Sequence, residues 1–230
     1  VVTVGVEAYT GNRVLLLAAL ADGATELRSL LDADDVARMR EALTTLGVVL
    51  RPGSAPRELH VEGTRGRFPV GRAELFLGNA GTAVRPLTAA LAMLGGDYTI
   101  RGVPRMYERP IGDLVAPLRR MGCDVRYLGN TGYPPLAIGP SGARAGEMIE
   151  IRGDVSSQFL SALLMALPLA GGARASASTV RVTTPLISRP YVTITTNLMR
   201  RFGVPVEMPD DATFVVPAGD GYRSPGRLRV

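Results

Sequence analysis

The chain has 230 residues, of which 46% are hydrophobic and 20% are charged, and its formal net charge is +5. This length and composition are typical of a soluble globular protein with a full core, and no apolar run is long enough to span a bilayer. The first residues, 1–4, lack the basic start and cleavage site of a signal peptide, so we expect a cytoplasmic protein.

In the first third of the chain, the pattern predicts one apolar and one amphipathic helix among short strands. The expected elements are a strand at 2–4, an irregular turn at 5–11, a buried helix opened by Asn12 and Arg13 and running to 21, a strand at 27–31, an amphipathic helix at 36–46, and strands near 48–50 and 59–61. The first helix is apolar all round, which is typical of a helix buried on every side. The segment Asp-Ala-Asp-Asp at 32–35 precedes the second helix and Gly47 follows it, as caps commonly do.

The same order of elements recurs twice. The expected elements are apolar helices at 82–94 and 159–167, amphipathic helices at 111–121 and 191–202, and strands at 98–100, 124–127, 179–182 and 213–216. Glycines end the three amphipathic helices at Gly47, Gly122 and Gly203, a spacing of about 75 to 80 residues. We therefore expect one α/β domain of three repeated units, at about 1–70, 71–145 and 146–230, with buried helices ringed by small sheets.

The residues available for chemistry exclude several kinds of site. With one cysteine, Cys123, and one histidine, His60, the chain offers no internal disulfide, no zinc cage and no convincing Cys–His pair. We expect Cys123 to be a buried structural thiol and His60 to lie on the solvated face of a strand. All 26 basic residues are arginine, which binds phosphate and carboxylate in a fork. Aromatic residues make up only 5% of the chain, so stacking platforms for nucleic acid are scarce and we expect no nucleic-acid partner.

A Gly-rich turn at 77–82 leads from an apolar run into the second apolar helix. Glycines let the backbone approach a ligand, and the free N–H groups of a helix start favour an anion. If the three buried helices pack side by side in the same direction, their starts meet at one end. Those starts carry 12–13, 79–82 and 156–158, all polar, which suits phosphate or carboxylate. An ordinary loop that caps a core helix is the alternative interpretation.

Each polar motif at a helix start also has a purely structural interpretation. Ser156, or Ser188 before Pro190, would serve as a simple N-cap, because Ser is a preferred cap and Pro a preferred first residue. Glu108 and Arg109 would form a surface ion pair that contributes little to stability. The joint occurrence of these motifs at helix starts instead favours one shared anionic site.

Four segments resemble the 5-enolpyruvylshikimate-3-phosphate synthase family, in that family's order. They are GNAGTAVRPL at 78–87, ERPIG at 108–112, SSQF at 156–159 and ISRPY at 187–191. The resemblance covers nearly the whole chain but only half of the family's usual length. It implies that this chain is one of the family's two domains, the one that is continuous in sequence, with the second domain missing. Each of those domains has three repeats, which agrees with the period found here.

The resemblance implies an enolpyruvyl (carboxyvinyl) transferase of the shikimate pathway, which leads to aromatic amino acids. The family transfers the enolpyruvyl group of phosphoenolpyruvate to the 5-hydroxyl of shikimate 3-phosphate, releases phosphate, and needs neither a metal nor an organic cofactor. The implied contacts of shikimate 3-phosphate are Arg13, Ser156, Ser157, Gln158, Ser188 and Tyr191. The implied contacts of phosphoenolpyruvate, or of the inhibitor glyphosate, are Asn79, Gly81, Arg109 and Gln158.

Two departures from the family pattern predict a chain that is inactive alone. The family's Pro-Gly-Ser-Lys-Ser segment falls on residues 5–9, where Ala8 replaces a Lys that binds phosphoenolpyruvate and Tyr9 replaces a Ser that binds substrate. Glu7 adds negative charge, which opposes an anion. The missing domain carries the family's acid/base carboxylates, so we expect no catalytic residue in this chain and no closure of two domains around the substrates.

We therefore expect the isolated chain to bind shikimate 3-phosphate weakly. One alternative is the related transferase that acts on UDP-N-acetylglucosamine, which usually uses a Cys on a mobile loop, whereas Cys123 follows a helix end. The other alternative is a non-catalytic binding domain that kept the fold, which Ala8 and the missing half favour.

Overall fold

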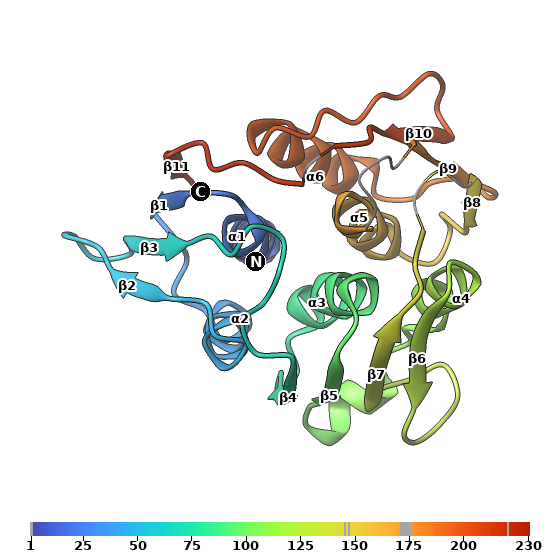
Figure 1. The fold of residues 1–230 in the computed structure, drawn as a ribbon, viewed down its shortest axis with the longest axis horizontal. Helices are drawn as coiled ribbons and strands as arrows, with labels where there is room; N and C mark the ends of the chain where they lie inside the picture. Colours follow the sequence, from blue (N-terminus) through green and yellow to red (C-terminus); the bar gives the residue numbers. More distant parts are fainter. Residues whose placement is uncertain (1, 145, 147, 171–175, 220) are drawn as a thin grey trace.

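Three helices form the centre of the fold, and Figure 1 shows them nearly end on. They are α1 (Val2–Leu20), α3 (Gly81–Leu94) and α5 (Ser157–Ala166). The structure is a computed structural model that describes the chain apart from residues 1, 145, 147, 171–175 and 220, and of residues 2–6 it describes only the backbone. In this part of the chain, no helix is long and apolar enough to cross a membrane.

Each central helix is followed along the chain by an outer, amphipathic one (Figure 1). The outer helices are α2 (Asp34–Thr45), α4 (Gly112–Arg120) and α6 (Arg189–Arg201). In α2, for example, Val36, Met39 and Leu43 are buried, whereas Arg40 and Glu41 are exposed. Amphipathic spacing of this kind lets a helix cover the core on one side and meet water on the other.

Small sheets lie outside the central helices (Figure 1). The strand order of one sheet is β11 (Arg227–Arg229), β1 (Ala24–Arg28), β3 (Leu59–Glu62), β2 (Leu50–Pro52). The order of a second sheet is β4 (Arg72–Phe76), β5 (Asp97–Arg101), β7 (Leu136–Ser141), β6 (Cys123–Tyr127). The order of a third sheet is β10 (Thr213–Val216), β9 (Ser178–Val182), β8 (Met148–Ile151). The pairs β1–β11, β4–β5 and β8–β9 are parallel and the others antiparallel. Leu27 lies opposite Leu228, so residues near the end of the chain complete the sheet that begins near its start. Two short 3₁₀ helices, Pro104–Glu108 and Leu167–Leu169, complete the elements described here.

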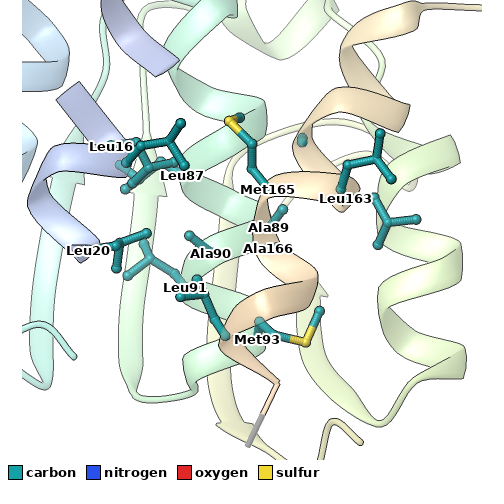
Figure 2. Close-up of a cluster of buried hydrophobic side chains, with 14 of the residues drawn as sticks. Leu16, Leu20, Leu87, Ala89, Ala90, Leu91, Met93, Leu163, Met165 and Ala166 are labelled. Atoms are coloured by element: carbon teal, nitrogen blue, oxygen red, sulfur yellow. The ribbon is translucent and has the colours of Figure 1, made fainter. Parts of the chain in front are cut away.

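The core lies between the three central helices (Figure 2). Leu16 of α1, Leu87 and Leu91 of α3 and Leu163 of α5 are at most 1% exposed. Helix α3 packs against both α1 and α5, and its small Ala89 side chain allows close approach. Burying a leucine side chain stabilises the folded state by about 1.5–3 kcal/mol, so the contacts between the three central helices contribute strongly to the stability of the fold.

The predicted fold class, α/β with buried helices and small sheets, is confirmed. The expected helices at 36–46, 82–94, 111–121, 159–167 and 191–202 are present, with ends that differ by one or two residues. His60 is exposed on β3 and Cys123 is buried at the start of β6, as expected. The division into repeats near residues 70 and 145 stays a prediction, which the alternation of central and outer helices supports.

The prediction for the N-terminal segment is wrong. The backbone is helical from Val2, where a strand and a turn were expected, so Asn12 and Arg13 lie inside α1 and not at its start. Gly11 lowers helix propensity by about 1 kcal/mol relative to Ala, which favours the predicted turn. However, Tyr9 is only 1% exposed, and its packing outweighs local propensity.

Four strands, β4, β7, β8 and β11, were not predicted from the sequence pattern. Strand β7 contains Gly139 and Pro140, which are uncommon within strands, while β8 and β11 are only four and three residues long. Strand β1 also ends earlier than predicted, at Arg28, because Ser29 has a positive φ of 62° and turns the chain away.

Candidate functional site

A pocket of about 370 Å³ opens at the starts of α5 and α6. Its lining combines five of the predicted ligand residues with residues of α1 and α3 and two apolar side chains. The lining residues are Ser156, Ser157, Gln158, Ser188, Tyr191, Tyr9, Thr82, Val155 and Ile187. The fold therefore brings the two predicted serine motifs, which are separate in the sequence, to one surface.

The serine at the start of α5 both caps the helix and lines the pocket. Ser156 is the N-cap, and its Oγ accepts a hydrogen bond of 3.2 Å from the backbone N–H of Gln158. The capping interpretation is therefore confirmed for Ser156, which nevertheless lines the pocket together with the buried Ser157. The positive end of the α5 dipole lies at this opening and favours a negatively charged ligand.

The start of α6 is built differently. Ser188 occupies the N-cap position and Pro190 the first turn, but the Ser188 side chain makes no capping hydrogen bond. Its backbone has φ 53° and ψ 39°, a left-handed conformation that is uncommon for residues other than glycine. Backbone strain of this kind concentrates at functional sites. The Ser188 side chain therefore does not cap α6, contrary to the structural interpretation, and its exposed hydroxyl lies beside the pocket.

Two guanidinium groups hold the Gly-rich turn beside the pocket. Arg109 Nη1 donates to the carbonyl of Asn79 (2.9 Å), and Arg85 Nη1 donates to the carbonyl of Gly81 (2.9 Å) and to Oε1 of Gln158 (3.2 Å). A Cβ at Gly81 would collide with Nη1 of Arg109, so a larger residue there would displace this guanidinium from the turn. Gln158 lines the pocket and also accepts a hydrogen bond from Arg85, so it connects the pocket with the Gly-rich turn.

The expected ion pair between Glu108 and Arg109 is absent from the described structure. Glu108 instead pairs with Arg105, one turn earlier in the short 3₁₀ helix. This leaves the Arg109 guanidinium to the Asn79 carbonyl and to any anion that enters.

Arg85 is a site residue that the sequence reasoning missed. It is only 9% exposed on α3, its Nη2 donates to the carbonyl of Pro110 (3.3 Å), and its guanidinium carbon lies 5.3 Å from the centre of the Phe159 ring. Burial, and then the charge of Arg109, lower the pKa of Arg85 to about 10, so it remains protonated at neutral pH. The signal that was available is an arginine inside an otherwise apolar helix.

Arg13 lies behind the pocket and does not line it. It is completely buried; its Nε donates to Thr195 Oγ1 (2.9 Å) and its Nη1 to the carbonyl of Tyr9 (3.2 Å). The guanidinium carbon lies 3.1 Å from the centre of the Tyr9 ring. Burial lowers the pKa of Arg13 to about 10, an effect to which the nearby charge of Arg85 adds.

In the described part of the chain, the three cations Arg13, Arg85 and Arg109 have no acidic partner. Within the described residues, none of them forms an ion pair with a carboxylate. Nε of Arg85 and Nη2 of Arg13 are buried without a hydrogen-bond partner in this part of the chain. Buried charges in proteins are normally paired, so these unpaired cations indicate a place for an anionic ligand.

The start of α3 is less open to a ligand than expected. The Thr82 backbone N–H lies 3.4 Å from Asp35 Oδ2, the Thr82 hydroxyl donates to the same oxygen, and Asn12 Nδ2 donates to that hydroxyl (2.8 Å). Asp35 was expected to help cap α2, but the N-cap of α2 is Ala33, without a side-chain bond. A carboxylate of the chain itself thus occupies this helix start, and the starts of α5 and α6 remain.

The fold and the site together define an α/β domain with a polar pocket beside buried cations, an arrangement that suits an anionic ligand. Its central helices carry the cations, and the starts of α5 and α6 carry the hydroxyls. Among the described residues, no group of three His, Cys, Asp or Glu side chains is arranged to hold a metal ion.

The comparison with known families identifies the family within this class. The family described as EPSP synthase (3-phosphoshikimate 1-carboxyvinyltransferase) matches residues 1–230, and the chain belongs to it. The 3-phosphoshikimate 1-carboxyvinyltransferase of Ralstonia nicotianae is 58% identical over 219 residues, and that of Burkholderia lata is 59% identical over 220 residues. Each alignment covers 95% of this chain and 50% of the relative, so the chain spans about half the length of these curated relatives.

Solved structures show the same fold. An EPSP synthase from Acinetobacter baumannii matches with a TM-score of 0.81 and 24% identity over 96% of this chain and 47% of its own. The enolpyruvyl transferase NikO from Streptomyces tendae matches with a TM-score of 0.63 and 17% identity over 97% of this chain and 49% of its own.

Proposed function

We propose that this chain forms one half of an EPSP synthase active site and by itself binds shikimate 3-phosphate weakly. The observation that carries the proposal is that residues 156–158 line one pocket together with Ser188 and Tyr191, at the starts of two helices. Hydroxyl groups and helix dipoles at one point suit a phosphate group. The matches to relatives with this activity support the assignment.

Each part of the pocket has a distinct proposed role. The hydroxyls of Ser156, Ser157 and Ser188 bind the phosphate of shikimate 3-phosphate, and the Tyr191 ring packs against its carbon ring. Gln158 reaches the same substrate from the side of the Gly-rich turn, where Arg85 holds its side-chain oxygen. Arg13 contacts this substrate only when Tyr9 has moved away from its guanidinium.

The neighbouring turn is the proposed site of phosphoenolpyruvate. Arg109 offers a planar fork to an anion, while Asn79 and Gly81 bring the backbone close to it, with Gln158 between the two substrates. The enolpyruvyl group would pass to the 5-hydroxyl of shikimate 3-phosphate with release of phosphate, without a metal or organic cofactor. The acid/base groups would come from the other half of a full-length protein, which acts in the cytoplasm.

A calorimetric titration of the chain with shikimate 3-phosphate tests the proposal. We expect saturable binding, a marked loss of affinity in the Ser156→Ala/Ser188→Ala variant, and no loss in Ser54→Ala, an exposed serine on a distant loop. With phosphoenolpyruvate added, the chain alone should release no phosphate. Absence of saturable binding in the folded chain would contradict the proposal.

A non-catalytic binding domain is the second candidate, favoured by Ala8 in place of the family's Lys. Fusing this domain to the remaining half of the Ralstonia nicotianae relative separates the two. Phosphate release with both substrates would support the transferase, whereas binding of shikimate 3-phosphate without release would support the second candidate.

The UDP-N-acetylglucosamine transferase has less support. Cys123 is buried in β6, and burial raises the pKa of its thiol, which is the reverse of what a reactive cysteine needs.

A further inference from the structure

Tyr9 forms part of the pocket wall and is fixed there by several contacts. Its hydroxyl lies 2.9 Å from Ser161 Oγ and 3.0 Å from Thr195 Oγ1, and it donates to the carbonyl of Tyr191 (2.9 Å). Its ring meets the Tyr191 ring edge to face, with centres 4.8 Å apart. Only 1% of Tyr9 is exposed, although it lines the pocket together with Ser156. The side chain therefore separates the open pocket from what lies behind it.

Behind Tyr9 lies the most deeply buried cation of the site. The Arg13 guanidinium carbon sits 3.1 Å from the centre of the Tyr9 ring, and its Nη2 has no hydrogen-bond partner among the described residues. An aromatic face attracts a cation but accepts few of its hydrogen bonds. A buried donor without an acceptor is rare in native structures, and it is satisfied when a ligand supplies an oxygen.

We infer that Tyr9 is a plug that determines which ligands the pocket accepts. With the plug in place, the pocket offers hydroxyls and helix starts for a phosphate group and conceals Arg13. With the plug displaced, the same pocket gains a buried cation for a second anionic group, such as a carboxylate on the same ligand. The inference rests on the proposed function, because the ligand that carries both groups is shikimate 3-phosphate.

The plug also gives a physical reason for weak binding by this chain. A ligand that needs Arg13 binds only the fraction of molecules in which Tyr9 has left, so its apparent affinity falls by that fraction. The hydroxyl contacts with Ser161 and Thr195 keep this fraction small. A ligand with only a phosphate group binds whether or not Tyr9 is displaced, so its affinity does not depend on that fraction.

The test compares two probes, shikimate 3-phosphate and inorganic phosphate, in calorimetric titrations of the whole chain. In Tyr9→Ser the Arg13 guanidinium is uncovered, and we expect shikimate 3-phosphate to bind roughly tenfold more tightly or better, as suits a hydrogen bond to a charged group. Inorganic phosphate should change by less than about twofold, because its subsite is untouched. Tyr9→Phe keeps the ring and loses the hydroxyl, so its gain should be smaller than that of Tyr9→Ser.

The outcomes separate this inference from the proposed function. If phosphate and shikimate 3-phosphate bind but Tyr9→Ser gives no gain for the latter, the plug is overturned and the proposed function stands. If neither ligand binds the wild-type chain or Tyr9→Ser, the proposed function fails and the inference fails with it. A gain of equal size for both probes also overturns the plug, because Arg13 would then not discriminate between them.

A second measurement on the unchanged chain covers the case in which Tyr9→Ser does not fold. Amide hydrogen exchange of residues 7–13 should accelerate at saturating shikimate 3-phosphate, because Tyr9 must leave its contacts, while the start of α5 becomes protected. Inorganic phosphate should protect the start of α5 without affecting residues 7–13. Unchanged exchange of residues 7–13 with bound shikimate 3-phosphate would overturn the inference.

Discussion

The two sides of the pocket place polar groups near a central helix in opposite ways. On the α5 side the helix begins at the pocket, so Ser156 and Ser157 stand at its positive end. On the α1 side the helix continues past the pocket, and Arg13 lies in its interior beneath Tyr9. The same type of apolar helix therefore gives an open pocket lined by hydroxyl groups in one place and a concealed cation in the other.

This difference shows that the position of a helix start, as much as the residues at that start, determines whether polar groups are open to a ligand. A helix that begins at the pocket exposes unpaired N–H groups there, and a ligand or a cap satisfies them. A helix that continues uses its N–H groups internally and turns side chains such as Arg13 towards the core. The start of α3 is a third case, because Asp35 already occupies it.

The largest effect is expected at Tyr9, on the closed side. Tyr9→Ala removes a buried ring and its hydroxyl contacts, and we expect it to lower the free energy of unfolding by about 3 kcal/mol, measured by urea denaturation. Tyr133→Ala, at a half-buried tyrosine on a loop, is the control and should cost clearly less. Equal losses at the two tyrosines would remove the contrast between the two sides.

Most of the fold could be predicted from the sequence because its helices have strong and different patterns. The apolar α3 and the amphipathic α6 have periodicities that no strand shares. Strand β7 could not be predicted because it contains Gly and Pro, and the first turns of α1 could not be predicted because they contain Gly11. In both segments tertiary packing, and not local propensity, determines the secondary structure.

The site was predictable where polar residues interrupt apolar runs, as at 156–158 and 188–191. Burial of Arg13 was not predictable, because it depends on Tyr9 reaching Ser161 and Thr195, which lie far away in the sequence. The role of Arg85 was also missed, because its contacts come from α5 and from Pro110, which no local pattern connects with α3.

A smaller effect is expected at the start of α5, on the open side. Ser156→Ala removes the N-cap bond to Gln158 and should lower the free energy of unfolding by about 1 kcal/mol. Ser157→Ala, at the first residue of the helix, is the matched control and should leave stability nearly unchanged. Both variants should weaken shikimate 3-phosphate binding in calorimetric titrations. If Ser156→Ala were fully stable, capping would not explain this residue.

The smallest change in the free energy of unfolding is expected at Ser188, where the substitution should stabilise the fold and not destabilise it. Ser188 has a left-handed backbone, which glycine adopts without strain, so Ser188→Gly should raise the free energy of unfolding by about 0.5 kcal/mol. Ser29→Gly is the matched control, because Ser29 also has a positive φ, of 62°, but does not line the pocket. Both variants should unfold at a higher urea concentration, and only Ser188→Gly should bind shikimate 3-phosphate more weakly. A loss of binding in both variants, or in neither, would contradict a role for the Ser188 side chain in binding the ligand.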